Sequence, residues 1–287
     1  MTVKNVGVLG TGVIGAGIVQ VCVEAGYTVV MIDVDQNTVN KAFKVVNKMW
    51  KKAVGKGVRT NDEVNRFNTM ITTSTELADL KDCDVVFEAV HEDLKLKQQI
   101  FQQLGGICKP EAILASNTSA LSITEIAVSS GRPEQVIGMH FFNPVSMMKL
   151  IEVVPGALTA PATVTIAEEL AWTMGKEPVI VKETPGFIVN RLIVPYINEA
   201  SLLLEEGVAS AEQIDKAIKL GTNMPMGPLA LADLIGVDVV LHVAEYFLQE
   251  LDDQRYRPSN LLKTMVEEGK LGRKTNKGFY DYGYMLY

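Results

Sequence analysis

The sequence predicts an α/β fold in which a doubly wound, mainly parallel sheet is followed by a second, all-helical domain. Three observations predict it. Short β-branched runs alternate with segments of helical period through roughly the first 180 residues, a glycine-rich turn joins the first run to the first helical segment, and the strand signal disappears from Gly186 onward. We expect a first domain over residues 1–184 and a helical domain over residues 185–287.

The strands of the first domain are expected where short apolar, β-branched runs are bounded by turn residues. The last two runs are expected to close the sheet around a helix over residues 162–174. The predicted strands cover residues 3–9, 28–33, 84–89, 112–116, 136–141, 150–154 and 178–181.

Helical periodicity is clearest over residues 37–54, where apolar residues at i, i+3, i+4 and i+7 form one face and lysines the other. In the second domain, the predicted helices cover residues 188–204, 211–220, 229–248 and 258–267. The first of these carries more apolar surface than one neighbouring helix would cover. We therefore predict that the chain forms a homodimer through its helical domain.

The composition, with 47% hydrophobic and 21% charged residues, is typical of a globular protein and excludes intrinsic disorder. The formal net charge of -7 argues against a nucleic-acid partner. No apolar run approaches the roughly 18 residues of a membrane span, so no membrane partner is expected.

The three cysteines are scattered and contain no C-x-x-C pair, which argues against a disulfide framework and a thiolate metal site. We expect no metal and a reducing, cytoplasmic compartment. The apolar strand pattern also begins within a few residues of Met1, so we expect no signal or transit peptide.

Residues 10–15, Gly-Thr-Gly-Val-Ile-Gly, follow an apolar strand and open a helix. Here Gly10 permits a tight turn, Gly12 lets the backbone approach a pyrophosphate, and Gly15 lets the helix pack on the strand. Asp33 ends the next strand, where it would accept hydrogen bonds from an adenosine ribose and repel a 2′-phosphate. The motif favours a Rossmann-type domain that binds NAD rather than NADP. A flavin site and a glycine turn without a ligand are the alternatives.

His140 ends an apolar strand, which places it at the carboxyl edge of the sheet, where ligands bind in doubly wound folds. Glu152 lies inside a later apolar strand, and a buried carboxylate needs a partner. If the turn at Asn143 and Pro144 folds the two strands together, Glu152 holds one ring nitrogen of His140 while the other faces a substrate. Histidine titrates near neutral pH, so the pair predicts proton transfer. The alternative is a structural pair in the core.

Hydrogen-bond donors are expected at the same edge. Residues 116–119, Ser-Asn-Thr-Ser, end a neighbouring strand and could hydrogen-bond a carbonyl oxygen as it gains negative charge, or could cap the next helix. Asn190 lies near the start of the first helix of the second domain, where it alone would indicate a solvated or capping residue. Asn143 beside Pro144 would likewise be an ordinary turn residue.

Seven motifs, in this order along the chain, resemble those of the L-3-hydroxyacyl-CoA dehydrogenase family, in particular its short bacterial 3-hydroxybutyryl-CoA members. The resemblance extends over essentially the whole chain. The motifs are residues 10–15, 88–92, 115–119, 140–145, 184–191, 225–228 and 277–280.

The resemblance implies an NAD-dependent enzyme that interconverts a short-chain (S)-3-hydroxyacyl-CoA and a 3-oxoacyl-CoA, most closely 3-hydroxybutyryl-CoA and acetoacetyl-CoA. It implies that His140 is the general base, that Glu152 pairs with it, and that Ser119 and Asn190 contact the reacting oxygen. It also implies a set of residues around the nicotinamide half of the cofactor: Glu92, Lys97, Asn117 and Asn143.

For coenzyme A, the resemblance points to Lys52 and Lys56, on and after the lysine-rich helix. A solvated lysine face is the alternative. Phe141 follows the histidine, whereas sugar-acid and carnitine dehydrogenases of the same superfamily usually carry proline there, so acyl-CoA substrates are preferred. Those dehydrogenases, and a non-catalytic NAD-binding protein, remain the alternative functions.

Overall fold

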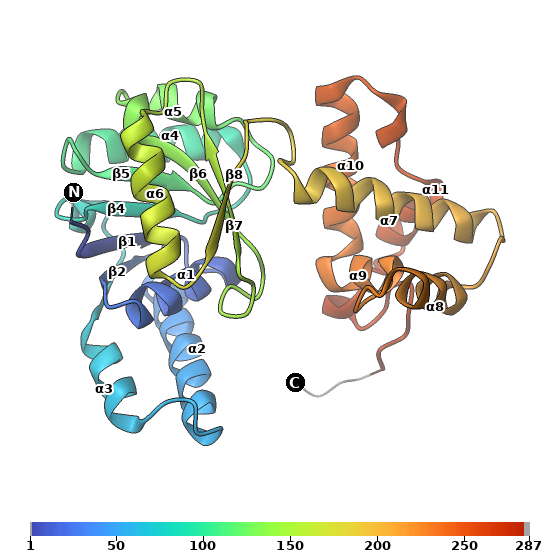
Figure 1. Cartoon of the computed structure of the whole chain (residues 1–287), viewed down its shortest axis with the longest axis horizontal. Coiled ribbons are helices and arrows are strands. Elements are labelled where there is room, and N and C mark those ends of the chain that lie inside the picture. Colours follow the sequence, from blue (N-terminus) through green and yellow to red (C-terminus); the bar gives the residue numbers. More distant parts are fainter. Residues whose placement is uncertain (1, 284–287) are drawn as a thin grey trace. The chain divides into compact units, whose positions relative to one another are not determined.

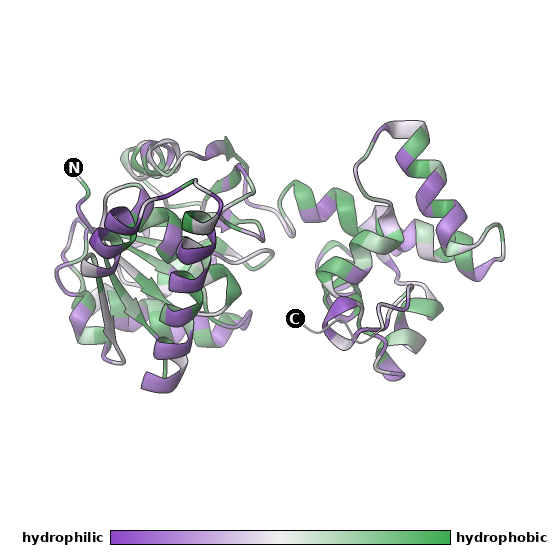
Figure 2. Ribbon diagram, turned by 90° about the horizontal axis from the view of Figure 1, so that it is seen from below, coloured by the Kyte–Doolittle hydropathy of each residue, from purple (hydrophilic) through white to green (hydrophobic). Residues whose placement is uncertain are grey.

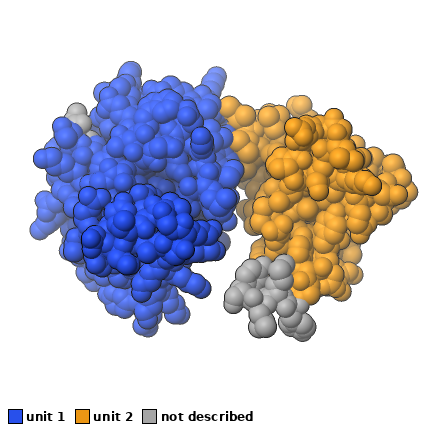
Figure 3. Space-filling view, turned by 60° about the horizontal axis from the view of Figure 1, so that its bottom comes forward, with its two compact units in different colours: residues 1–187 blue, residues 188–287 orange. Residues whose placement is uncertain are grey.

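The computed structural model describes residues 2–283, and the chain divides into two compact units, residues 1–187 and 188–287 (Figure 3). The first unit contains the sheet and the second is helical, which confirms the predicted fold class. None of the helices within the described residues is long and apolar enough to cross a lipid bilayer.

The sheet of the first unit has eight strands in the order β3-β2-β1-β4-β5-β6-β7-β8. All neighbours pair in parallel except β6 and β7, which are antiparallel, so β7 and β8 run opposite to the other strands. The strands are β1 (Asn5–Leu9), β2 (Thr28–Ile32), β3 (Ile71–Ser74), β4 (Val85–Glu88), β5 (Ile113–Ser116), β6 (Val136–Phe141), β7 (Leu150–Pro155) and β8 (Glu177–Ile180).

The seven predicted strands are all present, and β3 is the strand that the sequence analysis missed. It lies at the edge of the sheet, and its four residues include Thr72 and Thr73. A strand paired on one side only is less apolar than a central one, so the pattern for a buried strand is absent.

Helices cover both faces of the sheet (Figure 1). Val8 and Phe87 share a core with residues of α1, α2, α3 and α6, whereas Val86 and Leu114 share a second core with residues of α4 and α5. Hydrophobic residues accordingly gather along the strands, and hydrophilic ones along the outer sides of the helices (Figure 2). The helices are α1 (Val13–Glu24), α2 (Gln36–Gly55), α3 (Asn61–Thr69), α4 (Leu94–Ile107), α5 (Ile123–Ser129) and α6 (Pro161–Thr173).

The second unit contains helices around its own apolar core, which includes Ile197, Val240 and Phe247. Its helices are α7 (Val189–Glu205), α8 (Ala211–Thr222), α9 (Pro228–Ile235), α10 (Val237–Leu251) and α11 (Asn260–Glu267). Short 3-10 turns in the two units are η1 (Leu77–Leu80), η2 (Pro133–Gln135), η3 (Gln254–Tyr256) and η4 (Arg273–Thr275).

The single helix predicted over residues 229–248 is wrong. Gly236 has φ of 111°, a conformation open to glycine but strained for other residues, and it separates α9 from α10. Its N–H closes the last turn of α9 on the Ala232 carbonyl. The apolar period continues across the break, so hydrophobic spacing alone could not reveal it.

Candidate active site

The glycine-rich turn joins β1 to α1. At two of its three glycines, close neighbours leave no room for a side chain. Gly10 has φ of 89°, and a Cβ there would lie 2.6 Å from the Ala89 carbonyl oxygen. A Cβ on Gly15 would lie 1.8 Å from the Gly10 carbonyl oxygen. A Cβ on Gly12, by contrast, would meet nothing within 4 Å. Gly12 therefore presents bare backbone to open space, as a phosphate cradle requires.

Asp33 directly follows β2 and holds this turn in place. One oxygen, Oδ2, accepts hydrogen bonds from the Thr11 N–H at 2.6 Å and the Thr11 hydroxyl at 2.8 Å, and Oδ1 accepts from the Val34 N–H at 2.8 Å. Gly12 is the N-cap of α1 and supplies no side-chain cap. The N–H groups of the first turn of α1 therefore lack a side-chain cap, the arrangement that binds phosphate at helix N-termini.

A cleft of about 710 Å³ lies beside the turn. Of the predicted cofactor residues, Gly10, Gly12, Asp33 and Asn117 line it. Gly15 packs against Gly10 and Ala89, which belong to the lining. The rest of the lining is Leu9, Thr11, Val13, Ile14, Ile32, Val34, Thr75, Leu77, Ala89, Val90, His91, Leu96 and Ile100. His91 lies there because it follows β4 at the carboxyl edge of the sheet.

His140 and Glu152 occupy directly opposite positions of β6 and β7. Nδ1 of His140 lies 2.7 Å from Oε2 of Glu152, and the two side chains are 8% and 1% exposed. No hydrogen bond is made by Nε2 of His140 within residues 2–283. An acceptor carboxylate at Nδ1 favours the tautomer that keeps the Nδ1 proton, which leaves Nε2 for proton exchange.

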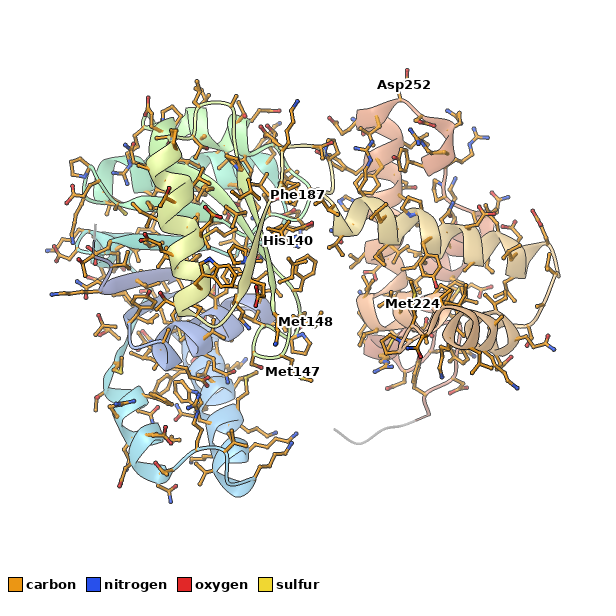
Figure 4. The ribbon with its side chains drawn as sticks, in the orientation of Figure 1. His140, Met147, Met148, Phe187, Met224 and Asp252 are labelled. Carbon is orange, nitrogen blue, oxygen red and sulfur yellow. The ribbon has the colours of Figure 1, made fainter. Side chains whose placement is uncertain are left out.

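Aromatic rings flank this imidazole. The His140 ring centroid is 4.4 Å from that of Phe142 and 5.8 Å from that of Phe187. Figure 4 shows His140 in the first unit, with Met147 and Met148 on the loop between β6 and β7. Both methionines are exposed.

The segment after β5 contains Asn117 and Ser119. The Asn117 side chain accepts a hydrogen bond from the Phe141 N–H at 2.8 Å, so it ties the end of β5 to the end of β6. The Ser119 N–H donates to Oε1 of Glu92 at 2.8 Å, and its hydroxyl lies 3.3 Å from the same oxygen. The structure thus brings Glu92 and Ser119 together, two residues that the sequence analysis placed at different parts of the site.

Lys97 is only 1% exposed, and its Nζ lies 2.6 Å from Oε1 of Glu88, which is fully buried. A weaker contact of 3.4 Å joins Nζ to Oε2 of Glu92. Glu88 ends the apolar strand β4, and no role was predicted for it from the sequence. The lysine nine residues later is its partner because α4 packs back over the sheet.

The remaining predicted residues are more scattered. Asn143 is exposed in the loop after β6, and its peptide bond to Pro144 is cis. Lys52 lies in the last turn of α2 and Lys56 caps that helix, and both side chains are exposed. Asn190 belongs to the second unit, as the second residue of α7.

A mainly parallel sheet with an uncapped glycine turn, an acidic residue after β2 and a buried His-Glu pair defines a dinucleotide-dependent dehydrogenase. Residues 5–184 match the NAD binding domain of 3-hydroxyacyl-CoA dehydrogenase, and residues 186–282 match its C-terminal domain. The chain belongs to the 3-hydroxyacyl-CoA dehydrogenase family and carries its NAD binding domain.

Similar proteins cover the chain almost completely. The 3-hydroxybutyryl-CoA dehydrogenase of Clostridioides difficile is 47% identical over 96% of this chain and 98% of its own. The human mitochondrial hydroxyacyl-coenzyme A dehydrogenase is 41% identical over 98% of this chain and 91% of its own. The crystal structure of (S)-3-hydroxybutyryl-CoA dehydrogenase from Ralstonia eutropha has a TM-score of 0.95 at 44% identity and covers 98% of this chain and 100% of its own.

Proposed function

We propose that the protein interconverts a short-chain (S)-3-hydroxyacyl-CoA and the corresponding 3-oxoacyl-CoA with NAD, and that 3-hydroxybutyryl-CoA and acetoacetyl-CoA are its substrates. The observation that carries the proposal is the buried pair of His140 and Glu152 at the carboxyl edge of an NAD binding domain. The names of similar proteins support the choice of substrate.

The residues of the glycine turn fit the cofactor. In the proposal, the backbone at Gly10 and Gly12 holds the pyrophosphate and the carboxylate of Asp33 accepts from the adenosine ribose, since its oxygens keep lone pairs beyond the bonds to Thr11 and Val34. When bound, the nicotinamide ring supplies the hydride acceptor in the oxidation and the hydride donor in the reduction.

His140 handles the proton. In the oxidation, its Nε2 removes the proton of the 3-hydroxyl group, and in the reduction the same nitrogen returns it. Glu152 holds Nδ1, which keeps the ring in one orientation and stabilises the imidazolium that forms. The aromatic rings of Phe142 and Phe187 restrict where the imidazole lies.

Ser119 and Asn190 are proposed to hold the oxygen on carbon 3, with their polar groups directed at the charge that develops there. Glu92, Lys97, Asn117 and Asn143 are proposed to surround the nicotinamide half of the cofactor. Asn117 lines the cleft, which supports its part in this set. The buried contact with Glu88 holds the Lys97 side chain in one position.

Coenzyme A is proposed to lie along α2. A groove of about 280 Å³ beside the glycine turn is lined by Val13, Lys41 and Met49, among others. Lys52 follows Met49 by three residues and so stands on the same side of the helix, with Lys56 at its end. Exposed ammonium groups there suit the phosphates of coenzyme A.

We also propose a homodimer formed through the helical domain and a reducing, cytoplasmic compartment. Leu192 and Leu220 in the second unit are exposed, which supports the homodimer. The thiols of Cys22, Cys83 and Cys108 are buried and free of disulfide bonds, which supports a reducing compartment. Light scattering at micromolar concentration gives the oligomeric state.

The test of the function is a spectrophotometric assay. Acetoacetyl-CoA with NADH should lose absorbance at the nicotinamide band, with a higher kcat/KM than longer 3-oxoacyl-CoA substrates. Free acetoacetate and dehydrocarnitine are the controls for sugar-acid and carnitine dehydrogenases. Turnover of these in place of the acyl-CoA, or binding of NADH without any turnover, would contradict the proposal.

A further inference from the structure

We infer that Glu88 is a positioning residue for the proposed reaction. It fixes the Lys97 ammonium so that Glu92 stays bound to the Ser119 segment. The inference rests on the proposed function, because that function gives Ser119 its role on the reacting oxygen. The chain of contacts runs from the end of β4, through α4, to the segment after β5.

The Glu88 carboxylate is fully buried and meets three donors. Oε1 accepts from Lys97 Nζ at 2.6 Å and from the Val90 N–H at 2.7 Å, and Oε2 accepts from the Ser116 hydroxyl at 2.7 Å. A buried carboxylate persists only when such partners compensate its desolvation. Because the donors come from a loop, a helix and a strand, they fix Glu88 in one place.

Lys97 stands between two carboxylates. Its Nζ is 2.6 Å from Glu88 and 3.4 Å from Glu92, so the nearer, fully buried partner sets where the ammonium lies. Glu92 is 30% exposed and receives the weaker contact. Lys97 thereby compensates the charge of Glu92 but leaves Oε1 of Glu92 to accept hydrogen bonds from other donors.

Glu92 uses its other oxygen for the segment after β5. Its Oε1 accepts from the Thr118 hydroxyl at 2.6 Å and from the Ser119 N–H at 2.8 Å. With the charge of Glu88 removed, Glu92 would be the remaining carboxylate near the Lys97 ammonium. The two would draw together, and Glu92 would be pulled away from Ser119.

The same strand offers a matched control at its opposite end. Asp84, just before β4, accepts from Lys109 Nζ at 2.9 Å and from the N–H groups of Lys4 and Asn5 at 2.8 and 2.9 Å. Asp84 and Glu88 thus each combine one lysine with other donors. Asp84 lies at the amino end of the parallel strand, the edge opposite to the candidate site.

The experiment is a double-mutant cycle with Glu88→Gln, Lys97→Met and both together, and with Asp84→Asn as control. Urea unfolding gives stability, fluorescence titration gives the Kd for NADH, and the acetoacetyl-CoA assay gives kcat and KM. Each single variant leaves a buried charge without its nearest opposite charge, so we expect both to be destabilised. The double variant should recover most of the lost stability.

Turnover should distinguish the two carboxylates. We expect Glu88→Gln, which leaves the Lys97 ammonium to draw Glu92 away from Ser119, to lower kcat at least about tenfold, the fold-change that matches loss of one hydrogen bond to a charged group. The double variant has no ammonium to draw Glu92 away, so its kcat should lie above that of Glu88→Gln. Asp84→Asn should lose stability and keep kcat. A structural pair alone would not produce this difference in kcat between Glu88→Gln and Asp84→Asn.

Two results would overturn the inference while leaving the proposed function intact. One is a kcat of Glu88→Gln close to that of the unmodified protein, and the other is an equal loss of kcat in Asp84→Asn. Absence of acetoacetyl-CoA turnover by the unmodified protein would instead overturn the proposed function, and with it the inference.

Discussion

The side chain of Asp33 binds Thr11 twice, through the backbone N–H at 2.6 Å and the hydroxyl at 2.8 Å. A carboxylate assigned from the sequence to an adenosine ribose therefore also holds the glycine turn in shape before any cofactor arrives. Preorganisation of this kind lowers the free-energy cost of binding.

These two tasks of Asp33 can be separated. Thr11→Val removes the hydroxyl bond and keeps the carboxylate, so we expect the Kd for NADH to rise less than about tenfold. Asp33→Ala removes both the hydrogen bonds to the turn and the proposed ribose contact, so it should raise the Kd for NADH more than Thr11→Val does. Fluorescence titration measures each Kd. In the unmodified protein NADPH should bind more weakly than NADH, and tighter binding of NADPH would refute the role given to Asp33.

The glycines of the turn give a second prediction. Gly12→Ala places a methyl group in open space at an ordinary φ of -62°, so stability should fall by at most about 1 kcal/mol while the Kd for NADH rises about tenfold or more. Gly10→Ala should cost more than about 1 kcal/mol, since its φ is positive and Ala89 is too close.

Thermal unfolding and NADH titration on the same samples check the pair. If Gly12→Ala binds NADH as well as the unmodified protein, the open space beside Gly12 does not receive the pyrophosphate.

The sequence predicted the histidine pair because both residues interrupt apolar strands that an Asn-Pro turn separates. Side chains alternate between the two faces of a sheet, so His140 and Glu152 could meet once β6 and β7 were neighbouring strands. Glu88 and Lys97 differ from this case. Their contact depends on how α4 packs over the sheet, which no local pattern encodes.

The break at Gly236 was hidden for a related reason, since α9 and α10 both present apolar residues with the same period. The edge strand β3 lacked the apolar signal that identified the other strands. Sequence patterns thus specified the elements that bury a continuous face, and they missed features that depend on tertiary contact or on a single φ angle.

The third prediction concerns the proton-transfer pair. His140→Gln should lower kcat by about 100-fold or more, the usual contribution of a general acid or base. Glu152→Gln keeps the shape and removes the charge that stabilises the imidazolium, so kcat should fall about tenfold or more while the Kd for NADH changes less than about twofold.

Steady-state kinetics and NADH titration measure both effects. Turnover of His140→Gln close to that of the unmodified protein would remove this residue from the mechanism. Loss of NADH binding in Glu152→Gln would instead mean that the carboxylate supports the sheet.

The last prediction concerns acid stability. Burial alone would raise the pKa of Asp84, but hydrogen bonds from the N–H groups of Asn5 and Lys4 and from the Lys109 ammonium outweigh it and lower the pKa below its ordinary value. An acid whose pKa is lower in the folded state stabilises the fold at pH values above its unfolded pKa of about 3.9. That contribution is lost as the pH falls through the folded pKa.

Asp84→Asn should therefore unfold at lower urea concentration than the unmodified protein at pH 7, and the difference should shrink at about pH 3.5, where the unfolded carboxyl is mostly protonated. Urea unfolding followed by circular dichroism at both pH values measures it. The bond from Lys109 is also sensitive to salt, so 1 M NaCl should reduce the difference at pH 7. A difference that grows as the pH is lowered would contradict the direction of the pKa shift, because the native carboxyl would then bind its proton more tightly than the unfolded one.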